Sequence, residues 1–459
     1  MEGKGKRNRK PRVRFDAMSV IEPNAAGIDI GASEHWVAVP PDRAEEFVRS
    51  FSAYTGELHK LADWLVECGI TTVAMESTGV YWVPLYGILE ARGIRVCLVN
   101  AHHVRSVPGR KSDVLDCQWL QKLHSCGLLR ASFRPEGQFV KLRTYLRHRE
   151  SLMQGASSHI QHMQKALTLM NVQLHRAIAD VTGTTGMAVI RDIVAGNHDP
   201  EVLANHRNHR CRASKDEIVA ALRGEYREEE LFVLRQALEL YDDYQSKIEQ
   251  CDREIARMLQ ELEKNAAPLE IPASPAKPGR EKRRAKEFLP EVRLPLYRIT
   301  SGVDLTQMTG LGELTALQII SEIGTDMSRW ASPNHFSAWA TLAPSCRITG
   351  GKRFPSRRPS SAHRVAQILR LAAVNAGRTQ TAIGAFYRRM CARIDKGKAV
   401  VATAAKLARI IYIMLKNRVP FTDPGADAYQ QRYRHRIVRN LKRKAAELGY
   451  DLVPVPASS

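Results

Sequence analysis

Short apolar segments alternate with helical patterns over the first 136 residues, and this alternation constrains the fold more than any other feature. Residues 27–39 (GIDIGASEHWVAV) predict a strand, a glycine turn and a second strand. Leucines 58, 61 and 65 follow helical spacing, and residues 71–77 (TTVAMES) predict a buried strand. A strand hairpin followed by alternating helices and strands is typical of an α/β layer with a mixed sheet. We therefore expect an α/β domain over residues 26–136.

Four carboxylates lie at the ends of these predicted strands and on one helical turn: Asp29, Glu76, Asp113 and Asp116. The last two are three residues apart, so a helix would turn both to the same side. Cleavage of a phosphodiester with Mg²⁺ requires several hard oxygen ligands that converge from different elements. Taken singly, these acids could instead form a turn, cap a helix or complement a helix N-terminus.

The charge balance indicates a polyanionic partner. Lysine and arginine number 69 against 48 acidic residues, a formal net charge of +21 over 459 residues. Nucleic acid is the first expectation and an anionic membrane surface the second. The sequence contains no apolar run of about 18 residues and no secretory signal, so we expect a cytoplasmic protein with no membrane partner. Eight cysteines without a CxxC pair do not support a zinc site.

Residues 137–264 predict a helical domain. One stripe of apolar residues runs from Leu142 to Met170, and the opposite face carries Lys141, Arg143, Arg147 and Arg149. From Leu234 to Leu262 apolar residues recur at alternating spacings of three and four, a heptad pattern typical of a coiled coil. This second stripe could serve helix packing or a dimer seam.

Three basic segments flank the globular parts. Residues 1–25 predict a flexible arm, and residues 265–295, rich in Pro, Ala, Lys and Arg, predict a linker. A further globular block over residues 296–423 is followed by a basic helix and tail over residues 424–459.

Two motifs in the 296–423 block indicate contact with phosphates. Residues 305–324 (LTQMTGLGELTALQIISEIG) resemble a helix-hairpin-helix, in which Gly310 and Gly312 could expose backbone N–H groups to a phosphate. A plain helical hairpin is the alternative. Residues 342–364 form a glycine-rich loop in which a hydroxyl beside two glycines could attack a phosphodiester, or the loop could simply contact phosphates. Its cations are Lys352, Arg353, Arg357 and Arg358.

These motifs, in this order, resemble the IS110 family of insertion-sequence transposases, recombinases that are guided by a bridge RNA. The segments GIDIG, MESTGVYW and KSDVLD carry the resemblance, together with residues 369–390. The resemblance implies a RuvC-like domain of the RNase H type, a coiled-coil domain and a C-terminal transposase domain. It also implies that Asp29, Glu76, Asp113 and Asp116 match the family's DEDD acids, which hold Mg²⁺.

The chain departs from the family at the nucleophile. The resemblance implies a serine just before Gly-Gly, and here that position is Thr349, followed by Gly350 and Gly351. A β-branched secondary hydroxyl is more hindered than serine, although threonine can serve in covalent catalysis. Thr349 could replace the serine, Ser345 or Ser356 could have taken the role, or this copy could be impaired.

The resulting hypothesis is a Mg²⁺-dependent recombinase that acts on double-stranded donor and target DNA. A structured noncoding guide RNA would specify both DNAs by base pairing, while the protein reads shape and backbone. The resemblance implies a homo-oligomer, dimer or tetramer, with an active site composed from two subunits. The first alternative is a RuvC-like endonuclease or junction resolvase that uses water. The second is a non-catalytic nucleic-acid-binding protein.

Overall fold

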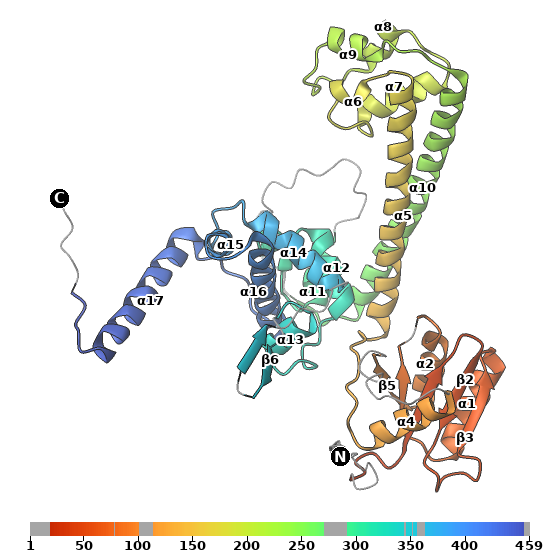
Figure 1. Ribbon diagram of the computed structural model, residues 1–459. Helices are drawn as coiled ribbons and strands as arrows, with labels where there is room; N and C mark the ends of the chain where they lie inside the picture. The colour runs from red at the N-terminus through yellow and green to blue at the C-terminus, as the bar shows by residue number, and fades with distance from the viewer. Residues whose placement is uncertain are drawn as a thin grey trace, which may run out of the picture. The chain divides into compact units, whose positions relative to one another are not determined.

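The computed structural model describes residues 19–77, 79–100, 113–269, 292–343, 346–350, 352–355 and 363–453. The chain divides into two compact units, Met1–Arg134 and Pro135–Ser459. The first unit is α/β and the second is almost entirely helical where it is described (Figure 1). None of the helices in the described ranges is both long enough and apolar enough to cross a bilayer.

A five-stranded mixed sheet forms the centre of the first unit, in the order β3-β2-β1-β4-β5. Its strands are β1 (Ala25–Ile30), β2 (Glu34–Ala38), β3 (Val48–Ser52), β4 (Thr72–Glu76) and β5 (Arg95–Val99). The β1–β2 and β2–β3 pairs are antiparallel, whereas β1–β4 and β4–β5 are parallel. The predicted mixed sheet and the strand hairpin at its start are therefore confirmed.

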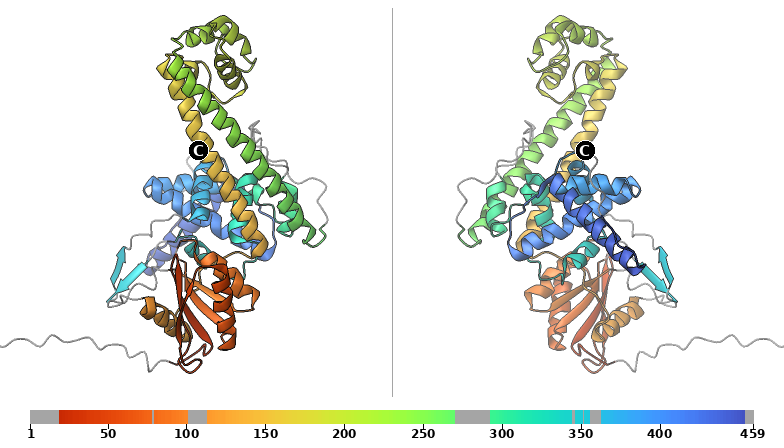
Figure 2. Two further views of the ribbon diagram at one scale, coloured as in Figure 1. Left: turned by 90° about the vertical axis from the view of Figure 1, so that its right-hand side faces the viewer. Right: turned by 90° about the vertical axis from the view of Figure 1, so that its left-hand side faces the viewer.

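Alternate residues of β1 face two different layers. Ala26, Ile28 and Ile30 are buried in a core with α1 (Thr55–Glu67) and α2 (Trp82–Ala91). The opposite face of the sheet carries α4 (Asp113–Ser125), so the unit has three layers (Figure 2). Because both faces are covered, β1 is apolar at almost every position and Asp29 is the exception.

Two long helices pack along one another in the second unit, α5 (Gly137–Leu169) and α10 (Glu228–Lys264). The predicted heptad stripe of α10 is buried, from Leu234 to Leu262, and it packs against α5 within the same chain. Gly155 permits this close approach, because a Cβ there would lie 2.5 Å from a ring carbon of Tyr244. The stripe therefore serves helix packing inside the chain.

One prediction for this helix pair is wrong. Arg149 was expected on the polar face of α5, but it is buried, and its Nε donates to Asp252 Oδ1 of α10 at 2.5 Å. The heptad pattern counts apolar residues only, so it cannot reveal a complementary pair of charges that is buried across the seam.

A small cap closes one end of the helix pair (Figure 1). It contains α6 (Leu174–Ala177), α7 (Thr184–Val194), α8 (Pro200–Leu203) and α9 (Lys215–Leu222). The two ends of the cap are joined by backbone hydrogen bonds, such as Gln173 N to Ala221 O at 2.8 Å. Its apolar residues continue the core of the α5–α10 pair.

The remaining helices form the C-terminal half of the second unit. They are α11 (Arg293–Ile299), α12 (Glu313–Ile323), α13 (Pro333–Trp339), α14 (Arg364–Ala376), α15 (Ala382–Cys391), α16 (Lys396–Asn417) and α17 (Gly425–Glu447). Residues 293–295, expected in the linker, are instead the start of α11. Pro295 is tolerated there because the first turn of a helix has no N–H bond to lose.

Candidate active site

Asp29 and Glu76 occupy neighbouring parallel strands. The register pairs Ile28 of β1 with Met75 of β4, so Asp29 and Glu76 each lie one residue further toward the carboxyl ends. Both side chains are half-buried. In open α/β sheets the carboxyl ends of the strands are where ligands bind.

Helix α4 lies directly on β1 because residue 27 is a glycine. A Cβ at Gly27 would lie 2.2 Å from Gln121 N and 2.4 Å from Cys117 O, both in the backbone of α4. Asp29 is two residues further along the strand, so its side chain points to the same face as the helix. No local pattern in the sequence predicts this role of Gly27.

Two side-chain contacts define the direction of α4. Gln121 Nε2 donates to Ala25 O at 3.2 Å, and His124 Nε2 lies 2.9 Å from Thr72 Oγ1. The end of the helix therefore lies over the start of β1 and β4, and its first turn lies toward their carboxyl ends. That first turn carries Asp113 and Asp116, as the spacing predicted.

The four acids share one electrostatic neighbourhood. The pKa of Asp29 is raised to about 6, chiefly by burial and then by the charges of Glu76, Asp113 and Asp116, against one backbone hydrogen bond from Ile30. Burial also raises the pKa of the Cys117 thiol to about 12, and Asp29 and Asp116 add to that rise. At Asp29, burial and the three neighbouring carboxylates thus outweigh the hydrogen bond from Ile30.

This donor set has the chemistry of a Mg²⁺ site. Carboxylate oxygens are the ligands that Mg²⁺ prefers, and a divalent cation offsets the repulsion that raises the pKa of Asp29. Within the described ranges, no three His, Cys, Asp or Glu side chains are close enough to hold a metal ion as they stand. Thr78 and residues 101–112, which adjoin Glu76 and Asp113, lie outside those ranges.

The hydroxyl loop is described in part. Strand β6 (Cys346–Thr349) pairs with β7 (Lys352–Pro355), and Thr349 lies opposite Lys352 at the turn. Gly350 has a φ of 57°, a left-handed conformation that favours glycine. Ser345, Gly351, Ser356, Arg357 and Arg358 lie outside the described residues, as do the side chains of Thr349 and Arg353. Lys352 is exposed.

The predicted helix-hairpin-helix has only one full helix beside its glycine turn. Leu305–Gln307 form a single 3-10 turn, and α12 begins after Gly312. Gly310 has a φ of 89°, and a Cβ there would lie 2.5 Å from Ala372 O of α14. Packing against α14 is thus sufficient to explain the glycine at position 310.

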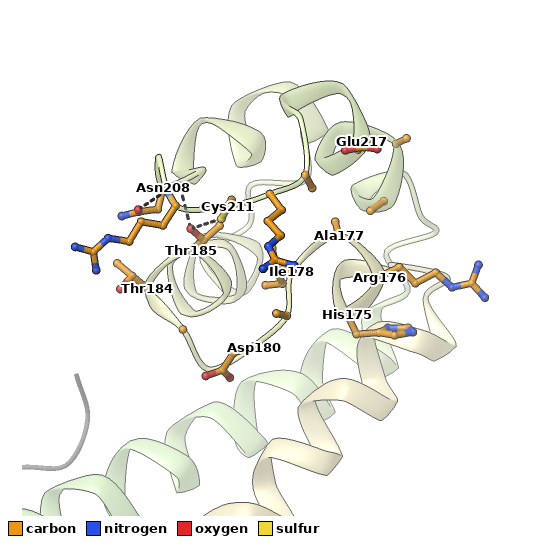
Figure 3. Close-up of a pocket in the computed structure, with 17 residues that line it drawn as sticks. His175, Arg176, Ala177, Ile178, Asp180, Thr184, Thr185, Asn208, Cys211 and Glu217 are labelled. Carbon is orange, nitrogen blue, oxygen red and sulfur yellow. Dashed lines mark hydrogen bonds between the residues drawn. The ribbon is translucent and has the colours of Figure 1, made fainter. Parts of the chain in front are cut away.

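A cavity of about 1120 Å³ lies in the cap, whereas the sequence predicts one helical domain over residues 137–264. Figure 3 shows residues from α6, α7 and α9 around it, with Thr185 Oγ1 3.5 Å from Cys211 Sγ. The signals that could have revealed the cap are the capping box of Ser214 and Glu217 and the proline that begins α8.

Two family models of transposases match separate parts of the chain, one N-terminal and one C-terminal. A DEDD transposase model of the IS110 type matches residues 26–172, which include the sheet, α4 and α5. A transposase model of the IS116/IS110/IS902 family matches residues 304–388, which include the glycine turn and the hydroxyl loop. No curated protein matches the chain. The two family matches agree in kind and in order, so the chain belongs to the IS110-type transposases and is a DNA transposase.

Proposed function

We propose that this transposase cleaves and exchanges DNA strands with Mg²⁺ held by Asp29, Glu76, Asp113 and Asp116. The observation that carries the proposal is that Asp29 and Glu76 end neighbouring parallel strands, with the charges of Asp113 and Asp116 acting on Asp29 at the same edge. The sheet order fits a RuvC-like domain, and Gly27 lets α4 bring its two acids to that edge. Bound Mg²⁺ would supply charge neutralisation at the phosphate.

Thr349 is the proposed nucleophile. Its hydroxyl loses a proton and forms a bond to phosphorus, while the bond from phosphorus to the leaving sugar oxygen breaks and that oxygen gains a proton. A hydroxyl of another strand then attacks the same phosphorus, displaces Thr349 and completes the exchange. Thr349 directly precedes the turn at Gly350, and Lys352 lies opposite it in the hairpin.

A structured guide RNA is the proposed source of sequence specificity. The chain has a formal net charge of +21, and a protein that neutralises many phosphates binds nucleic acid largely without regard to sequence. Base pairing by the guide would then select the donor and target DNAs. Recovery of a discrete structured RNA with the purified protein supports this step, and a protein that is active without RNA contradicts it.

The proposed homo-oligomer, dimer or tetramer, must use surfaces other than the heptad stripe of α10. That stripe is buried against α5 in the same chain. Chemical cross-linking at several protein concentrations measures the oligomer. A monomer that completes strand exchange contradicts an active site composed from two subunits.

Trapping of the protein–DNA adduct tests the nucleophile. Each hydroxyl of the loop is replaced in turn, as Thr349→Ala, Ser345→Ala and Ser356→Ala, and the adduct is detected on a denaturing gel. We expect Thr349→Ala alone to abolish the adduct. Persistence of the adduct in Thr349→Ala would refute the assignment, and cleavage by the wild type without any adduct would favour a nuclease that uses water.

A further inference from the structure

Three helices of the second unit bring cations and aromatic rings together at one place. Lys406 Nζ of α16 lies 4.4 Å from the ring centre of Phe386 and 4.9 Å from that of Tyr429. Arg389 Cζ of α15 lies 4.1 Å from the ring centre of Tyr433. We refer to these residues, with two arginines that adjoin them, as the cation–aromatic cluster: Phe386, Arg389, Lys406, Arg409, Tyr429, Tyr433 and Arg436.

The cations of this cluster repel one another. Burial, followed by the charges of Arg389, Arg409 and Arg436, lowers the pKa of Lys406 to about 8. The one acid that opposes this shift is Asp423. Its Oδ1 accepts hydrogen bonds from Ala382 N and Gly425 N, at 2.9 and 2.8 Å, and its Oδ2 is buried without a hydrogen-bond partner among the described residues. Among the described residues, the four cations of the cluster therefore outweigh the single carboxylate of Asp423 that acts on Lys406.

Polar atoms of the cluster also lack partners. Arg389 Nε is buried without a hydrogen-bond acceptor, although other atoms of this guanidinium bond to Tyr429 and Tyr433. Among the described residues, Lys406 Nζ has no hydrogen-bond acceptor or ion-pair partner either. A buried donor without an acceptor is costly, and an anion with several oxygens could accept from both groups.

Cation–π contacts alone do not explain this composition. One cation over an aromatic ring is enough to anchor a helix. Here Arg389 lies over all three rings, Lys406 over those of Phe386 and Tyr429, and Arg436 over that of Tyr433, each at 5.6 Å or less from the ring centre. An anchor would be more stable with fewer like charges, whereas an anion site requires them.

The surface beside the cluster is suited to a long polyanion. Helix α17 carries seven Lys or Arg residues and two acids, and only Ala426 of this helix is buried. Tyr433 and Tyr429 on the same helix are half-buried, which leaves part of each ring accessible. Partly accessible aromatic rings beside cations can contact the bases and phosphates of nucleic acids. A nucleic-acid backbone fits this surface better than a small anion does.

We propose that the cation–aromatic cluster binds a phosphate of a nucleic-acid backbone that continues along α17. The proposal rests on the proposed function in one respect, that the transposase engages long nucleic acids. Apart from Phe386, the cluster lies beyond residues 304–388, so it is a feature of this chain outside the part that matches the family.

The test compares Lys406→Met with Lys416→Met, the same substitution ten residues further along α16. Fluorescence anisotropy measures binding of full-length protein to a labelled random-sequence duplex DNA and to a labelled single-stranded RNA, over a range of salt concentrations. We expect Lys406→Met to weaken binding about ten-fold. We also expect it to reduce the slope of log K against log salt by about one. Lys416→Met should change neither quantity.

Thermal unfolding separates this site from a structural anchor. Removing one of several repelling cations should leave the unfolding midpoint of Lys406→Met unchanged or higher. A lower unfolding midpoint with an unchanged salt slope would show that Lys406 contributes only to packing. Equal losses of nucleic-acid binding in Lys406→Met and Lys416→Met would show that the location of the lysine on α16 has no effect. Either result overturns the proposal.

The two probes identify the source of the phosphate. If Lys406→Met weakens binding of duplex DNA only, the site binds DNA, and if it weakens binding of the RNA only, the site binds RNA. Unchanged binding of both probes overturns the proposal. All measurements are repeated in an Asp29→Asn background. We expect the Asp29→Asn protein to lose strand exchange but to bind nucleic acid as the wild type does. A failure of the proposed role of the acids can then be distinguished from a failure of this binding site.

Discussion

Gly27 of β1 lies against the backbone of Gln121 in α4, where a Cβ would come within 2.2 Å of the Gln121 nitrogen. This contact sets how closely the helix approaches the strand. It also sets how near Asp113 and Asp116 come to Asp29, since these acids occupy the first turn of the same helix. The geometry of the candidate active site thus depends on a residue that carries no functional group.

Replacement of Gly27 by valine should therefore disrupt both the fold and the chemistry. The side chain would force α4 off the sheet, and overpacking of this kind costs about 3 kcal/mol. Displacement of two acids by about 1 Å should lower strand exchange about 100-fold. Urea unfolding and a strand-exchange assay measure the two effects. Gly56→Val is the control, because nothing lies within 4 Å of a Cβ at that position. Equal behaviour of the two variants would contradict the role of Gly27.

Asp29→Asn should stabilise the protein while it abolishes activity. The folded state holds the proton of Asp29 more tightly than the unfolded chain does, because its pKa is raised from 3.8 to about 6. The ionised carboxylate is therefore destabilising above pH 6. In metal-free buffer at pH 8 the variant should gain about 2 kcal/mol of unfolding free energy.

The pH dependence provides the control for this prediction. The wild type without divalent ions should become more stable as the pH falls from 7 to 5, through the raised pKa of Asp29. Asp29→Asn should lack that component, and added Mg²⁺ should stabilise the wild type more than the variant. If Asp29→Asn is less stable than the wild type at pH 8, the acid has a structural role instead.

The buried pair of Arg149 and Asp252 should dominate the stability of the α5–α10 helices. Arg149→Met leaves Asp252 buried without its partner and should cost about 3–5 kcal/mol. The exposed pair of Arg191 and Asp242 is the control, and Arg191→Gln should cost less than about 1 kcal/mol. Chemical denaturation measures both variants. Similar costs for the two substitutions would contradict this account.

Thr349→Ser should form the protein–DNA adduct at least as fast as the wild type does. Serine has a primary hydroxyl without the β-branch, so its oxygen approaches phosphorus with less hindrance. Quenched time points on a denaturing gel give the rate. A Thr349→Ser variant that forms no adduct would indicate that the hydroxyl of residue 349 is not the attacking group.

Local patterns in the sequence predicted the sheet and the place of the acids. The GIDIG turn and the short apolar run that ends at Glu76 are signals within one element, and β1, β2 and β4 lie where they indicated. The spacing of Asp113 and Asp116 likewise placed them on one helical turn. Each prediction required only the period of a strand or a helix.

Features that depend on contact between distant segments could not be predicted in this way. Gly27 faces α4 some ninety positions later, and Arg149 pairs with Asp252 across 103 residues. Lys406 and Tyr429 belong to helices whose packing no local pattern specifies. The role of Thr349 also stays a prediction, since its side chain is outside the described residues.

Binding of Mn²⁺ as a paramagnetic substitute for Mg²⁺ tests the central claim most directly. The ion is titrated into the full-length protein with duplex DNA present, and its free concentration is followed by electron paramagnetic resonance. We predict that the wild type binds Mn²⁺ and that Asp29→Asn and Glu76→Gln each weaken binding at least about ten-fold. Glu67→Gln, an exposed acid on α1, should bind as the wild type does. Equal Mn²⁺ binding by the wild type and Asp29→Asn would contradict a metal site built on these acids.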